Sequence, residues 1–141
     1  MTAAEAPDSI VFDAEPLIAY FADEPGSDTV EQHLDAIERG ADGYCSAVTL
    51  TEVHYIVQAI DGEHRADTVV EVLAESGVRR VDTTDTWRRA ADFKARYSPS
   101  LGDAFALATA DVVDGTLVVG ADDDFDSIDD VDISRIRNEG V

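Results

Sequence analysis

The chain has 141 residues, of which 45% are hydrophobic, enough for one folded domain with a core of its own. No stretch approaches the roughly 20 apolar residues that span a bilayer, and the N-terminal residues lack the basic and apolar regions of a signal peptide. We therefore expect a soluble, cytoplasmic protein that does not associate with membranes. A single cysteine, Cys45, excludes an internal disulfide and a zinc site built from several thiolates.

The charge balance is strongly acidic, with 31 Asp and Glu residues against 10 Lys and Arg residues and a formal net charge of −21. Such a surface should repel nucleic acids at low salt. The apolar residues are nevertheless abundant and periodic, which distinguishes the chain from a disordered acidic tail. Excess aspartate with only one lysine is typical of halophilic proteins, in which concentrated ions screen the repulsion. The net negative charge would then be an adaptation to a concentrated salt solution and would say little about what the protein binds.

Short β-branched runs alternate with amphipathic stretches along the whole chain. Strands are expected at residues 9–14, 43–48, 78–83, 116–121 and, more weakly, 132–137. Helices are expected at residues 15–23, 27–40, 49–60, 63–77, 84–97 and 100–115. This alternation predicts a three-layer α/β/α fold with a central, mostly parallel sheet of about five strands. We expect a single domain that spans residues 1–141.

Acidic residues fall where the expected strands end. Asp13 ends the first strand and Asp122 follows the fourth, while Glu52 and Asp103 are expected in the first turns of two helices. In parallel sheets the ligand crevice lies at the carboxyl ends of the strands, so these four carboxylates could meet in one pocket, with Asp124 as a fifth. Hard oxygen ligands of this kind suit Mg²⁺ or Mn²⁺.

Each acid also has a structural explanation. Thr49-x-x-Glu52 and Ser100-x-x-Asp103 both match the capping box or its acidic variant, so each acid could serve only its helix start. The remaining acids could be turn residues or a solvated loop. Taken one at a time, these explanations are the more common ones. The coincidence of all four acids at one edge is harder to explain in this way.

Four segments of the chain resemble the PIN-domain family, in particular the VapC-type ribonuclease toxins. These segments read "IVFDAEPLIAYF", "SAVTLTEVHYIV", "PSLGDAFALATA" and "TLVVGADDDFD", and they follow the family's order over essentially the whole chain. The resemblance implies a PIN-like fold with a set of acids that are catalytic and bind metal. These are Asp13, Glu52, Asp103 and Asp122, with Asp124 at a more variable metal-binding position before Phe125.

The chain departs from the family pattern at two positions. Ala14 stands where the family commonly has Ser or Thr after the first Asp, and Gly120 replaces the hydroxyl residue of the turn before Asp122. Such hydroxyls usually hold the metal-binding carboxylates from the second layer of residues. Their absence predicts a looser site with weaker metal affinity.

The resemblance further implies a metal-dependent endoribonuclease that cleaves single-stranded RNA, commonly transfer or ribosomal RNA, and leaves 5′-phosphate and 3′-hydroxyl ends. Mg²⁺ or Mn²⁺ would activate water for attack on the phosphodiester, and Asp103 or Asp122 would accept its proton. A cognate VapB-like antitoxin of a type II toxin–antitoxin pair and a homodimer are implied as well.

Basic residues that could contact RNA concentrate just upstream of Asp103. They are Arg79, Arg80, Arg88, Arg89, Lys94 and Arg96. An equally good explanation is a set of solvated surface residues. Trp87 could stack on a base, although burial in the core is the better expectation.

Two other functions remain open. Ala14 and Gly120 are consistent with an alternative hypothesis, a PIN-like module that binds RNA or protein and has weak or absent catalytic activity. A phosphate-accepting receiver domain also clusters acids at strand ends, but it needs a lysine at a late strand end. The single lysine, Lys94, is expected within a helix, which disfavours that reading.

Overall fold

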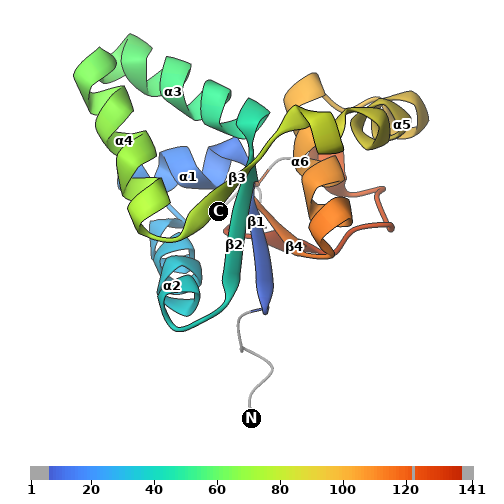
Figure 1. The fold of residues 1–141 in the computed structure, drawn as a ribbon, viewed down its shortest axis with the longest axis horizontal. Helices are drawn as coiled ribbons and strands as arrows, with labels where there is room; N and C mark the ends of the chain where they lie inside the picture. The colour runs from blue at the N-terminus through green and yellow to red at the C-terminus, as the bar shows by residue number, and fades with distance from the viewer. Residues whose placement is uncertain (1–6, 122, 138–141) are drawn as a thin grey trace.

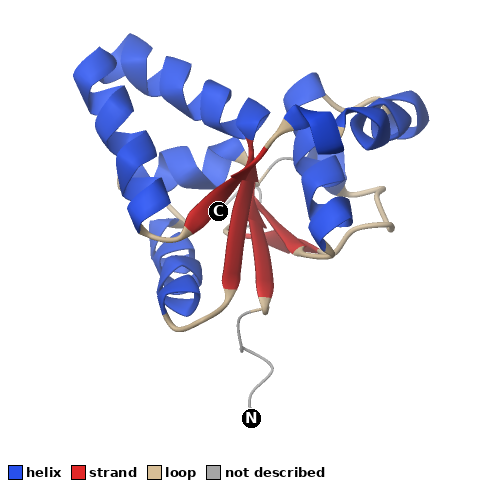
Figure 2. Ribbon diagram, viewed as in Figure 1, coloured by secondary structure: helices blue, strands red, loops and turns tan. Residues whose placement is uncertain are grey.

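The computed structural model describes residues 7–121 and 123–137, and of Asp123 it describes only the backbone. Within these residues the sheet contains five strands. The strands are β1 (Ser9–Phe12), β2 (Asp42–Ser46), β3 (Val78–Val81), β4 (Thr116–Val119) and β5 (Ile133–Arg135). Their order in the sheet is β3-β2-β1-β4-β5, and every neighbouring pair is parallel. The expected α/β fold with a five-stranded sheet is confirmed (Figure 2).

Six helices among the described residues cover the two faces of this sheet (Figure 1). They are α1 (Ala14–Phe21), α2 (Ser27–Glu38), α3 (Ala47–Asp61), α4 (Glu63–Glu75), α5 (Trp87–Tyr97) and α6 (Leu101–Val113). The first four pack on one face and the last two on the other. None of the helices in the described ranges has both the length and the hydropathy of a membrane span.

The core is divided by the sheet because successive strand side chains point to opposite faces. Ile10 and Phe12 contact the cluster under α1–α4, whereas Val11, Leu117 and Val119 contact the cluster under α5 and α6. All five are completely buried. Burial of each such side chain contributes about 1.5–3 kcal/mol, so β1 and β4 make a large contribution to the stability of the fold.

The strand order reverses between β1 and β4. The chain moves outward from β1 through β2 to β3 and then crosses to β4, on the other side of β1. In open parallel sheets such a switch point opens a crevice at the carboxyl ends of the strands, because the connections leave in opposite directions. The Asp13 N–H donates to the Val118 carbonyl over 3.0 Å, which places Asp13 at this point.

The boundary between β2 and α3 lies two residues earlier than the sequence predicts. Ser46 is the N-cap, and its Oγ accepts a hydrogen bond from the Val48 N–H over 3.1 Å. The helix therefore begins at Ala47, and Glu52 lies in its second turn rather than its first. The capping-box explanation for Thr49 and Glu52 is wrong because Ser46, which is completely buried, already satisfies the helix start.

Candidate metal-binding site

Asp13 is the most perturbed carboxyl group at the switch point. It lies between β1 and α1, and its side chain is 6% exposed. Burial is the main reason that its pKa rises from 3.8 to about 8, and the negative charges of Asp103, Glu52 and Glu15 raise it further. The hydrogen bond from the Ala14 N–H acts in the opposite direction. No described Lys or Arg side chain forms an ion pair with Asp13, so a proton or an added cation is needed to neutralise it.

Glu52 reaches from α3 to the start of α6. Its carboxylate lies against Gly102, where a Cβ atom would come within 2.2 Å of Glu52 Oε1. Burial raises the pKa of Glu52 as well. The absence of a side chain at position 102 therefore permits this approach between two segments that are 50 residues apart in the sequence.

Asp103 follows Gly102 in the first turn of α6. Ser100 is the N-cap of this helix, and its Oγ accepts a hydrogen bond from the Asp103 N–H over 3.1 Å. The predicted cap at Ser100 is thus confirmed. Since the hydroxyl of Ser100 serves the helix start, and since the charge of Asp103 acts on the pKa of Asp13, the carboxylate of Asp103 belongs to the electrostatic environment of the switch point.

The structure therefore brings the charges of Asp13, Glu52 and Asp103 together from three segments. Within residues 7–121 and 123–137 no three His, Cys, Asp or Glu side chains converge closely enough to enclose an ion. Asp122 lies outside the described residues, and Asp124 is exposed, so their predicted roles stay predictions. The donors present are hard oxygens, and Asp13 is a buried acid that pairs with no basic side chain in the described part of the chain. Both features fit a divalent cation such as Mg²⁺ or Mn²⁺.

Glu15 is an acid at this site that the sequence analysis missed. It lies in the first turn of α1, and its Oε2 accepts hydrogen bonds from the Ala121 N–H over 3.1 Å and from Arg137 Nη2 over 2.8 Å. Its position two residues after Asp13, in the same strand-to-helix junction, was the available signal. The partners were not visible because they lie more than 100 residues away.

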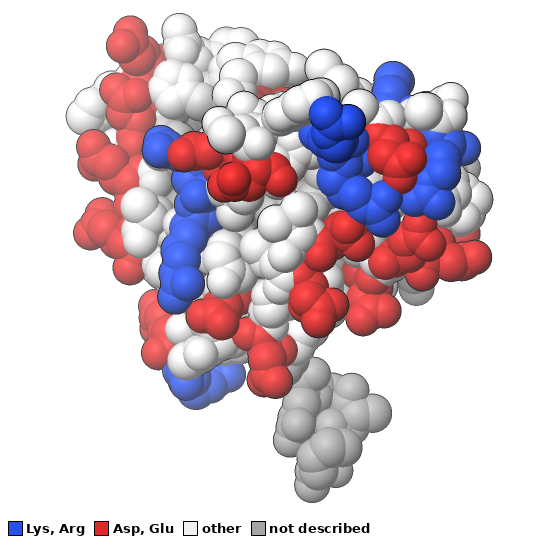
Figure 3. Space-filling view, turned by 45° about the vertical axis from the view of Figure 1, so that its right-hand side comes forward, with Lys and Arg blue, Asp and Glu red and all other residues white. Residues whose placement is uncertain are grey.

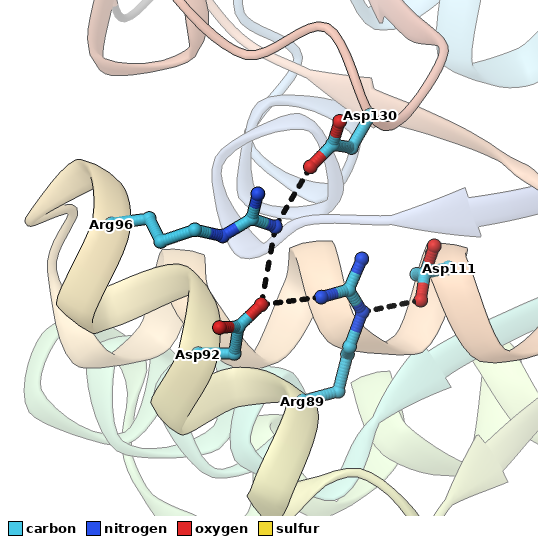
Figure 4. Close-up of a pocket in the computed structure, with 5 residues that line it drawn as sticks. All are labelled: Arg89, Asp92, Arg96, Asp111 and Asp130. Carbon is cyan, nitrogen blue, oxygen red and sulfur yellow. Dashed lines mark hydrogen bonds and ion pairs between the residues drawn. The ribbon is translucent and has the colours of Figure 1, made fainter.

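Two of the basic residues predicted to contact RNA form an ion-pair network with three aspartates. Figure 4 shows Arg89 and Arg96 projecting from α5, with Asp92 between them. Arg89 pairs with Asp111 over 2.6 Å and with Asp92 over 2.5 Å, and Arg96 pairs with Asp130 over 2.8 Å and Asp92 over 3.1 Å. Any phosphate at these guanidinium groups has to compete with carboxylates.

Three more of the predicted RNA contacts also have hydrogen-bonding partners within the protein. Arg79 pairs with Asp42 over 3.3 Å, Arg80 pairs with Asp82 over 2.9 Å, and Lys94 Nζ donates to the carbonyl of Pro99. Figure 3 shows basic side chains standing next to acidic ones across the face that it draws. The acidic chain therefore presents a mixed surface here rather than a purely basic stripe.

Trp87 is 54% exposed, so the expectation that it is buried is wrong. The residue begins α5, one turn before Ala90 reaches the core, and this position leaves the indole at the surface. The guanidinium of Arg88 lies 4.9 Å from the centroid of the Trp87 ring. An exposed aromatic ring with an arginine on it is suited to stacking against a base.

Substitution of Gly102 by Ala should displace Glu52 and, if Glu52 holds a metal ion, weaken Mn²⁺ binding by roughly tenfold, the scale of changes in residues that orient metal ligands. Alanine favours helix by about 1 kcal/mol over glycine, which opposes the strain of displacing Glu52, so the protein should stay folded. Isothermal titration with Mn²⁺ measures the affinity. In a Glu52→Ala background, Gly102→Ala should have no further effect on Mn²⁺ affinity. An equal loss in both backgrounds would show that position 102 does not act through Glu52.

Comparison with known proteins identifies the fold family. A family model for the PIN domain matches residues 10–131. A toxin–antitoxin complex from Klebsiella pneumoniae contains a similar chain, with a TM-score of 0.67 and 22% identity over 92% of this chain and 98% of that chain. The VapBC2 complex from Rickettsia felis, bound to promoter DNA, gives a TM-score of 0.74 at 13% identity, with 90% and 98% coverage. No curated protein sequence is significantly similar.

Proposed function

Because the chain belongs to the PIN-domain family, we propose that it is a divalent-metal-dependent endoribonuclease and the toxin of a VapBC-type toxin–antitoxin pair. The observation that carries this proposal is the buried carboxyl of Asp13 at the switch point, whose pKa is raised by burial and by the charges of Asp103 and Glu52. An arrangement that raises the pKa of a carboxyl group to about 8 is costly without a cation, and such costs are typical of functional sites.

The proposed mechanism assigns a role to each acid. Bound Mg²⁺ or Mn²⁺ would supply the charge that activates water and stabilises the departing 3′ oxygen of the RNA. Asp13, Glu52 and Asp103 would hold the ion, together with Asp122 and, at the exposed edge, Asp124. Asp103 stands at a helix N-terminus, which stabilises its negative charge. Asp103 or Asp122 would accept the proton from the attacking water.

The proposed partners follow from the proposed role as a toxin. We propose a VapB-like antitoxin that covers the acidic site, a homodimer, and transfer or ribosomal RNA as the substrate in the cytoplasm. The similar chains from Klebsiella pneumoniae and Rickettsia felis belong to toxin–antitoxin complexes, which supports an antitoxin. The basic residues of β3 and α5 would bind the RNA, and phosphate groups of the RNA would replace the carboxylates that pair with these residues in the free protein.

A binding module without catalysis is the second candidate. Ala14 and Gly120 favour it because they remove hydroxyl groups that would support the metal-binding carboxylates. The nuclease and the binding module differ in their need for a metal ion. A nuclease needs the ion for turnover, whereas a binding module retains RNA without it.

The experiment that tests the proposal measures cleavage of single-stranded RNA at high salt with added Mn²⁺, after removal of any copurified antitoxin. We expect products with 5′-phosphate ends and a melting temperature that rises with Mn²⁺, by mass action, as the ion binds the folded state. A folded protein that neither cleaves RNA nor gains stability from Mn²⁺ would contradict the nuclease. Retention of RNA in that case would support the binding module.

Lower salt should destabilise this protein if it is halophilic, as we propose from its net charge of −21. Screening falls as the Debye length grows from about 3 Å at 1 M to about 10 Å at 0.1 M, so repulsion among surface carboxylates then acts over longer distances. Thermal unfolding in KCl at these two concentrations measures the effect. Choline chloride at matched ionic strength separates screening from specific K⁺ binding. Equal melting temperatures in molar and dilute KCl would contradict the halophilic reading.

A further inference from the structure

The carboxylate of Glu15 joins three segments that are far apart in the sequence. It projects from the first turn of α1, two residues after Asp13, and accepts the hydrogen bond from the Ala121 N–H in the turn after β4. Arg137, which follows β5, donates to the same oxygen of Glu15 through Nη2 and to the carbonyl of Pro25 through Nη1 over 2.9 Å. The Glu15 side chain therefore connects the segment that follows β4 and the segment that follows β5 to the start of α1.

Gly120 is the residue that makes this contact possible. A Cβ atom at position 120 would lie 1.6 Å from Glu15 Oε2 and 2.0 Å from its Cδ atom, so any larger side chain would displace the carboxylate. The backbone at Gly120 does not have a positive φ angle, and alanine would therefore be acceptable there on conformational grounds. Space for Glu15, rather than backbone freedom, explains the glycine.

We infer that Glu15 is a positioning residue for the proposed metal site: it holds the turn at Gly120 and Ala121 against the N-terminus of α1 and Asp13. This inference rests on the proposed function. The hydrogen bond from Ala121 fixes the backbone immediately before Asp122 in the sequence, and the ion pair with Arg137 fixes the carboxylate. Glu15 and Gly120 together perform the bracing for which a hydroxyl group at position 120 would otherwise be needed.

The test compares single and double variants by two measurements, the Mn²⁺ dissociation constant from isothermal titration and kcat for RNA cleavage. Glu15→Ala removes both contacts and should weaken Mn²⁺ binding by about tenfold. Glu15→Gln retains an oxygen that accepts the Ala121 N–H bond, so its affinity should return toward that of the parent. Gly120→Ala should resemble Glu15→Ala, and the double variant should be no worse than either single variant.

Glu63→Ala is the matched control, since Glu63 is an acid in the first turn of α4, away from the site. It should lower helix stability slightly and leave Mn²⁺ binding unchanged. Equal losses in Glu15→Ala and Glu15→Gln would show an effect of charge alone and overturn the positioning role. Parent-like Mn²⁺ affinity and kcat in Glu15→Ala would also overturn it. A parent protein that neither binds Mn²⁺ nor cleaves RNA would overturn the proposed function and this inference with it.

Discussion

Replacing Asp103 with Asn is expected to lower kcat for RNA cleavage by more than about 100-fold, a larger loss than supporting residues usually cause, while the protein stays folded. The substitution removes one negative charge near Asp13 at almost constant shape. The helix start should be preserved because Ser100 Oγ accepts the hydrogen bond from the main-chain N–H of residue 103. The free energy of unfolding should change by at most about 1 kcal/mol.

The control for this experiment is Asp114→Asn at the other end of α6. Asp114 is the C-cap residue with a φ of 53°, a conformation that asparagine also adopts readily. Its charge is removed far from the switch point, so cleavage should remain at the level of the parent. Cleavage by Asp103→Asn close to that of the parent would assign Asp103 a purely structural role and remove it from the proposed mechanism.

The second large effect is on the pH dependence of stability through Asp13. Its pKa rises from 3.8 in the unfolded chain to about 8 in the fold, so the folded state binds the extra proton between these values. Stability contributed by the protonated form is therefore present at low pH and is lost as the pH rises toward 8. The free energy of unfolding should fall by at most about 1.4 kcal/mol per pH unit through this group.

Denaturant unfolding of the parent and of Asp13→Asn between about pH 6 and pH 8 measures this contribution. The variant cannot ionise at this position, so it should lack the decline and become more stable than the parent at the upper end. Asp8→Asn, an exposed acid just before β1, is the control and should keep the decline of the parent. Identical slopes for the parent and Asp13→Asn would contradict a buried, uncompensated carboxyl group.

Mn²⁺ should counteract the loss of stability at rising pH if the ion replaces the proton on Asp13. Because the ion would bind the ionised carboxylate, the stabilisation by a fixed Mn²⁺ concentration should grow as the pH rises toward 8. Thermal shifts at several pH values, with Asp13→Asn as the variant that lacks the ligand charge, measure this effect.

Local sequence was sufficient to establish the fold. β-branched runs and amphipathic periodicity indicated the strands and helices in the right order, because these patterns depend on neighbours within a few residues. Parallel strands then placed Asp13 at the edge where the ligand crevice opens. Local patterns did not determine where α3 begins: it starts at Ala47 rather than Thr49 because Ser46, a buried strand residue, is also a competent N-cap.

Only the tertiary structure decided which side chains meet. The contact of Glu52 with Gly102, and that of Glu15 with Gly120, join residues 50 or more positions apart in the sequence, and each depends on the space left by a missing side chain. The sequence likewise did not reveal which carboxylates pair with Arg89 and Arg96, or that Trp87 is exposed. The physical reason is that periodicity specifies which face of an element is buried, whereas contacts between elements depend on how whole helices and strands pack.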